Sequence, residues 1–222
     1  LLERPTFSRY AAALQQQQQS QRAELSRTFW QEFAARKPEP LNFYGRIHPK
    51  HTQNVVRWTH NLGSVQTARL IALAETVDLG TVTSEFRQYC LNAALFLGLM
   101  HQLTGNEQLG FVTTIHNRAT QVNRQTVGVL MELCPVLVTV LPDDSIISLL
   151  QKVAAEMQQL LRHFRHGACR AASDLALEAM FSFVLRPSLQ FDGQTVEHTI
   201  VHPGSGSERL ALHVHHLADD NS

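Results

Sequence analysis

The sequence has no excess of charge of either sign. Its 222 residues include 19 lysine and arginine residues against 19 aspartate and glutamate residues. A balanced chain presents no electrostatic footprint for a nucleic acid or an anionic membrane surface. We therefore expect neither nucleic acid nor a membrane among its partners.

Long hydrophobic runs are also missing. The longest apolar stretch lies within 127–141 and is interrupted by Glu132 and Pro135, whereas a transmembrane helix needs about 20 apolar residues. No segment has the pattern of a secretory signal peptide. Cysteine is scarce, and its spacing fits neither a CxxC motif nor a metal site, which predicts buried, reduced thiols in a cytoplasmic protein. The three thiols belong to Cys90, Cys134 and Cys169.

Motifs that carry chemistry are few. Nucleophile motifs, phosphate-binding glycine loops and paired-carboxylate signatures are absent from the sequence. Twelve histidines are present, and His213 and His215 alternate as residues on one face of a strand do. No cysteine, aspartate or glutamate completes a zinc-ligand spacing around them. We predict no metal site, and structural or surface positions for the histidines.

The strongest pattern in the chain lies between Leu103 and Leu141. Two apolar, β-rich runs, LGFVTTI and VLMELCPVLVTVL, flank a polar connector. Their short length and β-branched residues predict a strand on each side. Pro135 has no N–H to donate, so the second strand is bulged, lies at a sheet edge or starts there. Gly128, where the connector re-enters the apolar run, suits a close backbone approach or unusual dihedral angles.

The remaining sequence divides into helices and strands around this pattern. Its length fits one domain with a substantial core. Prolines and a glycine interrupt residues 38–63, where only 55–62 has strand character. Hydrophobic periodicity and capping residues predict helices over 6–37, 64–79, 84–103, 145–165 and 173–179. Further strands are predicted over 180–187, 197–203 and 208–217.

In order and spacing, these segments resemble the C-terminal half of the condensation-domain family of nonribosomal peptide synthetases. Members of that family have a helix ending in Thr-Gly, a strand ending in Asn-Arg, a loop, and then Ile/Val-Gly-x-Phe-Val-Asn-Thr-x-x-x-Arg. The present chain has Thr104 and Gly105, then Asn117 and Arg118, and then Gly128 within an apolar run.

The resemblance has clear departures. The Asn-Thr pair of the family motif is replaced by Glu132 and Leu133, and its arginine by Leu137. The family also has a Tyr-x-Asp-Tyr/Phe-Ala-x-Trp helix, of which this chain keeps Phe7 and Tyr10 as counterparts but lacks the aspartate and the tryptophan.

The resemblance implies an α/β (α+β) fold, the C-terminal lobe of a two-lobed chloramphenicol acetyltransferase-like architecture, with a mixed β-sheet and packed helices. Residues 1–222 would be the C-terminal half of a condensation-type domain. Residues 1–37 would form leading helices, 38–63 a crossing segment and 64–217 an α/β sandwich lobe. The N-terminal lobe would be absent. The chain begins without methionine, as a piece of a longer protein would.

The implied activity is that of a condensation domain. Such a domain joins a carrier-protein-bound acyl or peptidyl donor to an acceptor amine in nonribosomal peptide or hybrid polyketide-peptide biosynthesis. The partners would be donor and acceptor carrier proteins and the N-terminal lobe. No cofactor would bind directly, because phosphopantetheine is carried by the partners. The family's catalytic histidine comes from the N-terminal lobe, so no catalytic residue is expected here.

One spacing near the C-terminus is similar to the catalytic motif of the family. His215, His216 and Asp220 have the spacing of the family's catalytic His-His-x-x-x-Asp-Gly motif without its glycine. In the family that motif precedes every segment matched above. We therefore do not assign catalysis to these three residues.

The resemblance implies that this lobe supplies a wall of the substrate tunnel and that the connector, residues 118–128, is the loop that crosses beneath the active site. It points to five candidate substrate-binding residues. They are Asn117, Arg118, Gly128, Met131 and Glu132. Arg118 is expected to anchor the connector through charge-assisted hydrogen bonds. Strict alternation puts Glu132 on one face with Leu130, and Met131 on the other with Leu133. That leaves Glu132 either lining the tunnel or on the surface.

Two other functions remain open. The chain is also compatible with a degenerate, non-catalytic relative that recruits a partner enzyme or a carrier protein, which the altered residues 132, 133 and 137 favour. A sister acyltransferase that forms esters or releases a chain is the other alternative. An intact His-His-x-x-x-Asp-Gly motif upstream would favour catalysis, and its loss would favour recruitment.

Overall fold

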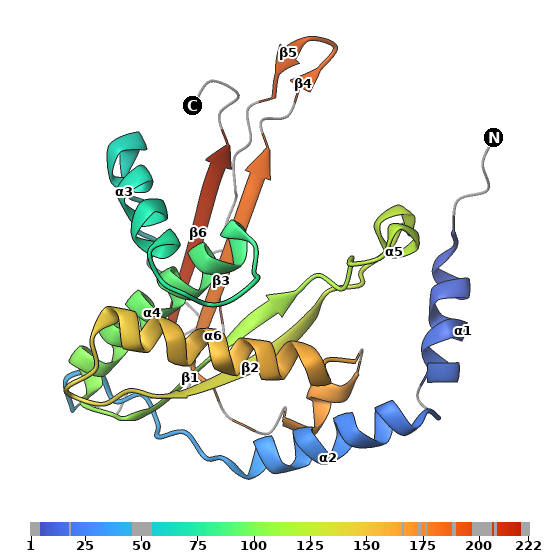
Figure 1. Ribbon diagram of the computed structural model, residues 1–222, viewed down its shortest axis with the longest axis horizontal. Helices are drawn as coiled ribbons and strands as arrows, with labels where there is room; N and C mark the ends of the chain where they lie inside the picture. The colour runs from blue at the N-terminus through green and yellow to red at the C-terminus, as the bar shows by residue number, and fades with distance from the viewer. Residues whose placement is uncertain are drawn as a thin grey trace.

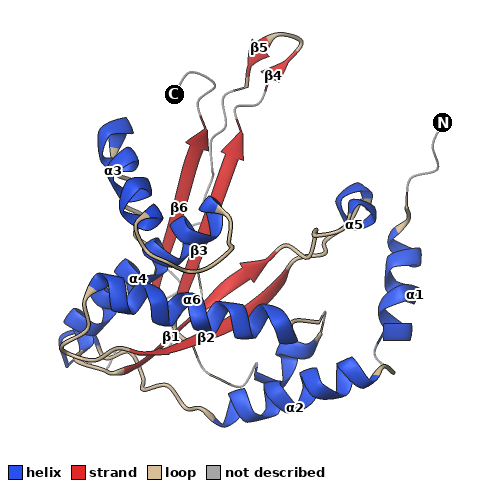
Figure 2. Ribbon diagram, in the orientation of Figure 1, coloured by secondary structure: helices blue, strands red, loops and turns tan. Residues whose placement is uncertain are grey.

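The computed structural model shows a mixed sheet covered by helices (Figures 1 and 2). Among the described residues, four α-helices precede the first strand, one α-helix follows each of the first two strands, and the last four strands come at the end without a helix between them. The structure describes residues 5–17, 19–45, 55–165, 167–172, 175, 177–187, 190–196, 206 and 208–218.

The main sheet has four strands in the order β2-β1-β3-β6. β1 pairs with β2 antiparallel, whereas β1 with β3 and β3 with β6 are parallel, so the sheet is mixed, as the resemblance implied. β4 and β5 form a separate two-stranded hairpin that the sequence patterns did not predict. The strands are β1 Gln108–Ile115, β2 Glu132–Thr139, β3 Ala179–Pro187, β4 Gln190–Phe191, β5 Gln194–Thr195 and β6 Leu210–Ala218.

Two long helices cover one face of the sheet, and both begin and end within two residues of the predicted bounds. α4 (Ser84–Thr104) starts at Thr83, whose hydroxyl accepts the Phe86 N–H at 3.2 Å. It ends at Gly105, which has a φ of +74°. α6 (Ile146–His163) starts in the same way at Ser145.

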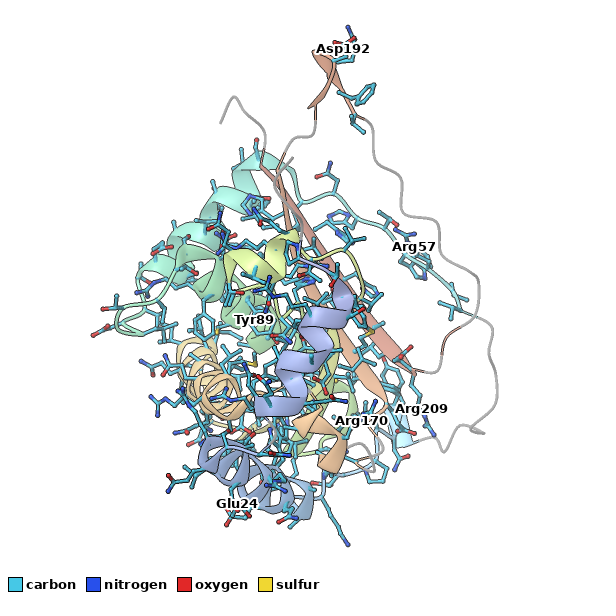
Figure 3. The ribbon with its side chains drawn as sticks, turned by 90° about the vertical axis from the view of Figure 1, so that its right-hand side faces the viewer. Glu24, Arg57, Tyr89, Arg170, Asp192 and Arg209 are labelled. Carbon is cyan, nitrogen blue, oxygen red and sulfur yellow. The ribbon has the colours of Figure 1, made fainter. Side chains whose placement is uncertain are left out.

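Aromatic rings fill the space between α4 and the sheet. Phe96 of α4, Phe111 of β1 and Phe181 of β3 are fully buried, and their ring centroids lie 5.5–6.1 Å apart. Tyr89, labelled in Figure 3, is partly buried and packs edge-on against Phe181, with ring centroids 5.2 Å apart. Such clusters combine a large buried apolar area with favourable ring geometry. The core therefore sits between the helices and the sheet.

α2 (Gln21–Ala35) belongs to the same core, although it is distant in sequence. Trp30 is fully buried, and its indole N–H donates to the His163 carbonyl at 3.2 Å. Ser26 donates to the same carbonyl, and the rings of Phe29 and His163 stack at 4.3 Å. α2 thus satisfies a carbonyl at the end of α6 that has no partner within the helix.

The single helix predicted over 6–37 is wrong. The structure has two helices, α1 (Phe7–Gln17) and α2, which meet at an angle (Figure 1). The break occurs because Ser20 adopts extended dihedral angles and its hydroxyl accepts the Ala23 N–H at 3.2 Å, which caps α2. A serine that satisfies a helix N-terminus in this way competes with helix continuation.

Two other predictions differ from the structure. Residues 55–62 are exposed and form no strand, although they have strand propensity; α3 (Gly63–Glu75) follows them. The described residues of the helix predicted over 173–179 are not helical, and two short 3₁₀ helices, η1 (Phe43–Gly45) and η2 (Ala168–Ala172), were not expected. Ser173 and the strand predicted over 197–203 lie outside the described residues.

The outer edge of β2 is capped by charged side chains. Arg36 donates to the Leu137 carbonyl at 2.8 Å, and Lys152 donates to the Thr139 carbonyl at 3.3 Å. The Val140 N–H bonds instead to Glu107, on the β1 side, so odd-numbered residues direct their backbone groups outward. Pro135 is one of these odd-numbered residues, so its missing N–H removes no hydrogen bond between β2 and β1. Of the three predicted alternatives for this proline, a bulge, a sheet edge or a strand start, the structure shows the sheet edge.

No helix within the described part of the chain is long and apolar enough to span a bilayer.

Candidate functional site

The connector, residues 118–128, joins the ends of β1 and β2 and carries a short helix. α5 (Gln121–Gln125) starts at Thr120, whose hydroxyl accepts the Asn123 N–H at 3.1 Å. The sequence pattern predicts only a loop for this segment. The signal for the short helix is Thr120, a capping residue placed three positions before Asn123.

Arg118 holds the connector closed. One of its guanidinium nitrogens donates to the carbonyls of Asn123 at 2.8 Å and Thr126 at 3.0 Å, and the other donates to the carbonyl of Gly128 at 2.8 Å. A planar guanidinium suits several carbonyls at once, and its charge strengthens each bond. The predicted anchoring contacts are therefore present.

Two further side chains tighten the start of the connector. Arg124 donates to the carbonyls of Arg118 at 3.1 Å and Ala119 at 3.2 Å. Asn123 donates from its side-chain amide to the Asn117 carbonyl at 3.0 Å. The connector is thus stabilised mainly by polar side chains bonded to its own backbone.

Asn117, two residues after the end of β1, has an unusual backbone conformation. Its φ is +52°, a left-handed value that asparagine tolerates better than most residues. Its side-chain amide donates to the Tyr10 hydroxyl at 2.6 Å. Burial raises the pKa of Tyr10 above its usual value, and the charge of Glu132 raises it further while Arg118 opposes both. Tyr10 therefore remains a neutral phenol beside the connector.

Gly128 closes the connector in a conformation that favours glycine. Its φ is +147°, and a Cβ atom at this position would lie 2.7 Å from Cδ2 of Phe7. The prediction of unusual dihedral angles or a close approach is confirmed on both counts.

The segment that enters β2 has one apolar face open and one buried. Leu130 is 1% exposed and Cys134 is fully buried, so the expected alternation holds. The open face consists of four apolar side chains, each between 46% and 76% exposed, which we call the apolar stripe: Val127, Val129, Met131 and Leu133.

Glu132 lies on the buried side of this segment rather than on the apolar stripe. Its two carboxylate oxygens accept the backbone N–H of Gly167 at 3.0 and 2.9 Å. This contact ties the start of β2 to the turn that begins η2. Sequence reasoning had no signal for it, because the two residues are 35 positions apart.

Two thiols lie beside this contact. The sulfur atoms of Cys134 and Cys169 are 3.4 Å apart, and both side chains are buried. The hydrogen bond to Cys134 and burial raise the pKa of Cys169, and burial raises the pKa of Cys90 to about 12. All three cysteines are buried and outside disulfides, as predicted. Thiols with raised pKa are poor nucleophiles.

The histidines His213, His215 and His216 belong to β6 of the sheet, which is distant in sequence from the connector. His216 Nδ1 contacts the side-chain oxygen of Gln88 at 2.9 Å. Asp220, His198 and His202 lie outside the described residues. Within the part of the chain that the structure describes, no group of three or more histidine, cysteine, aspartate or glutamate side chains is arranged to hold a metal ion.

Solved structures of condensation domains share this fold. The first condensation domain of the CDA synthetase matches with a TM-score of 0.62 and 18% sequence identity, over 83% of this chain and 40% of that one. The starter condensation domain of rhizomide synthetase matches with a TM-score of 0.67 and 19% identity, over 89% and 45%. The SgcC5 protein from Streptomyces globisporus matches with a TM-score of 0.68 and 14% identity, over 97% and 52%.

The present chain therefore spans about half or less of the length of these structures. The search of curated proteins found no match. The family model for the condensation domain matches residues 1–216, which is nearly the whole sequence. The chain belongs to the condensation domain family.

Proposed function

We propose that this chain is the C-terminal half of a condensation domain that joins a carrier-bound acyl or peptidyl donor to an acceptor amine. Residues 1–37 would be its leading helices, 38–63 its crossing segment and 64–217 its sandwich lobe. The carrying observation is a connector anchored on Arg118 that leads directly into an open apolar stripe. The family membership supports the reaction class.

The apolar stripe suits the substrates of such a reaction. An acyl chain and the methylene groups of a phosphopantetheine arm are flexible and apolar over much of their length, so they gain by leaving water for an apolar wall. Met131 is the most adaptable member, because its unbranched thioether side chain fits varied shapes. We assign Met131 to the wall itself.

The other four candidate residues would act by holding this wall in place. Asn117 and Arg118 fix the connector, Gly128 permits its turn into β2, and Glu132 holds the entry of β2 against Gly167. In this proposal none of the four needs to touch the substrate.

Proton transfer from the acceptor amine would come from outside this chain. A histidine suits this step because its pKa lies near neutral pH, and the proposed N-terminal lobe would supply it. The phosphopantetheine would be carried by donor and acceptor carrier proteins. We place the reaction in the cytoplasm, in keeping with three cysteines outside disulfides.

One observation favours a second function. Leu137, which stands where the family motif has arginine, is buried in the core. This position therefore packs against neighbours instead of presenting a charge. A condensation-like domain that has lost catalysis and recruits a carrier protein or a partner enzyme would tolerate this change.

Intact-protein mass spectrometry distinguishes the two functions. Donor and acceptor carrier proteins loaded with thioester substrates would be incubated with the full-length protein, with residues 1–222 alone, and with buffer. We expect a condensed product on the acceptor carrier with the full-length protein only. Binding of the carriers without product would support recruitment. Product formed by residues 1–222 alone would overturn the assignment of the base and turn attention to His215 and His216.

A further inference from the structure

Helix α1 contacts the connector region through the side chains of Tyr10 and Phe7. Tyr10 is the buried residue of this helix, and it lies outside the main hydrophobic core formed by α2, α4, α6 and the sheet. Figure 1 shows α1 at the same end of the molecule as α5, and Figure 3, which faces that end, shows α1 in the foreground. The buried contact of α1 is therefore the one made by Tyr10.

Tyr10 and its neighbour Phe7 reach both ends of the connector. The Tyr10 hydroxyl accepts the side-chain N–H of Asn117, the residue just before the connector, at 2.6 Å. The Phe7 ring lies against Gly128, the last residue of the connector, so closely that a Cβ atom there would overlap it. The two aromatic rings contact each other, with centroids 5.9 Å apart.

The Tyr10 and Phe7 contacts are made with two residues whose backbone dihedral angles are unusual. Asn117 and Gly128 have positive φ values of 52° and 147°, which extended strands do not adopt. Backbone in such regions persists when surrounding contacts over-determine it. The Arg118 bonds hold the connector internally, whereas α1 is a separate element that contacts its two ends from outside.

We propose that Tyr10 and Phe7 are positioning residues that fix the connector, and with it the apolar stripe, relative to the rest of the lobe. The stripe starts at Val127, next to the residue on which Phe7 rests, so movement of Gly128 moves the wall directly. For its catalytic consequence this inference rests on the proposed condensation function. Its structural consequence does not.

Hydrogen exchange of the full-length protein tests the structural part. Tyr10→Phe keeps the ring and removes the acceptor of the Asn117 amide, and Tyr44→Phe is the matched control at an exposed tyrosine. We expect amides of residues 117–128 to exchange roughly fivefold faster in Tyr10→Phe, as expected for loss of one hydrogen bond. Amides of α4 and α6, and the urea midpoint, should match the parent.

A double variant isolates the contact itself. Asn117→Ala should speed exchange by at least as much, because it removes the same bond and also puts alanine at a left-handed φ. Tyr10→Phe combined with Asn117→Ala should be no faster than Asn117→Ala alone, because both remove the same bond. Exchange in Tyr10→Phe equal to the parent overturns the proposal. Strictly additive effects in the double variant overturn the direct contact as its cause.

Kinetics tests the catalytic part separately. In the full-length protein, Tyr10→Phe should lower kcat/KM with carrier-bound substrates severalfold, while Tyr44→Phe should not. Faster exchange with unchanged kcat/KM would overturn the link between connector and wall. Faster exchange in a full-length protein that forms no condensed product would sustain the positioning role of Tyr10 and reject the condensation function.

Discussion

The helix-covered sheet and the connector beside it are held together by different forces. Between α4 and the sheet, apolar side chains are excluded from water, and three phenylalanine rings meet there. In the connector, guanidinium and amide groups bond to backbone carbonyls, and few side chains are buried. Apolar burial is non-directional and scales with area, whereas these hydrogen bonds depend on geometry.

The difference has a consequence for local stability. A segment with few buried apolar contacts opens at lower free energy than the core to which it is attached. The connector is therefore the part of the lobe whose shape can be changed without unfolding the sheet. Substitutions in each region should separate global stability from local order.

The largest effect is expected in the core. Phe111→Ala removes a fully buried ring that contacts Phe96 and Phe181. Burial lost together with the cavity left behind should cost about 3–5 kcal/mol of unfolding free energy, measured by urea denaturation. Phe191→Ala, at a ring that is 78% exposed, is the matched control and should change little. A loss below about 1 kcal/mol for Phe111→Ala would mean that the site collapses around the cavity.

A smaller and local effect is expected at Arg118. Arg118→Ala removes three donors to the carbonyls of Asn123, Thr126 and Gly128. Amides of 117–128 should exchange at least about tenfold faster, since charged hydrogen bonds are worth about 1.5–3 kcal/mol. The urea midpoint should stay within error, because the connector lies outside the core.

Two controls accompany this variant. Arg27→Ala removes an arginine from an exposed ion pair with Glu24 and should leave connector exchange unchanged. Arg118→Lys keeps the charge but lacks the planar fork, so it should restore only part of the protection. Parental exchange and parental condensation activity in Arg118→Ala would refute the anchor.

The smallest effect is expected at Glu132. Glu132→Gln keeps one carbonyl acceptor for the Gly167 N–H and removes the charge, so the unfolding free energy should fall by about 1 kcal/mol or less. Amides of η2 should exchange faster, whereas those of the connector should not. Glu24→Gln, at an exposed helical position, is the control. Weakened use of acceptor amines with unchanged η2 exchange would instead show that the carboxylate serves the substrate.

Sequence reasoning found the elements that local signals define. The strands of 108–115 and 132–139 follow from β-branched runs, and α4 and α6 follow from a capping hydroxyl before a long apolar helix. It failed where the outcome depends on tertiary contacts. Residues 55–62 have strand propensity, yet a strand forms only when another strand pairs with it.

The candidate site was found in part for the same reason. The anchoring contacts of Arg118 lie within ten residues of it, so a local motif was enough. The Tyr10 contact with Asn117 spans 107 positions. No periodicity or spacing in one sequence reports a contact of that kind, which depends on how α1 folds back onto the connector.

The capped edge of β2 affects whether other protein chains can pair with this sheet. An unprotected edge strand offers unpaired carbonyls and amides to any passing extended chain. Here Arg36 and Lys152 already donate to the outward carbonyls of Leu137 and Thr139, and Pro135 has no backbone N–H to donate. A strand that paired with this edge would have to displace the side chains of Arg36 and Lys152, and it would find no N–H at Pro135. These capped carbonyls lie at the end of β2 away from the apolar stripe, so that end of the sheet edge is protected against self-association.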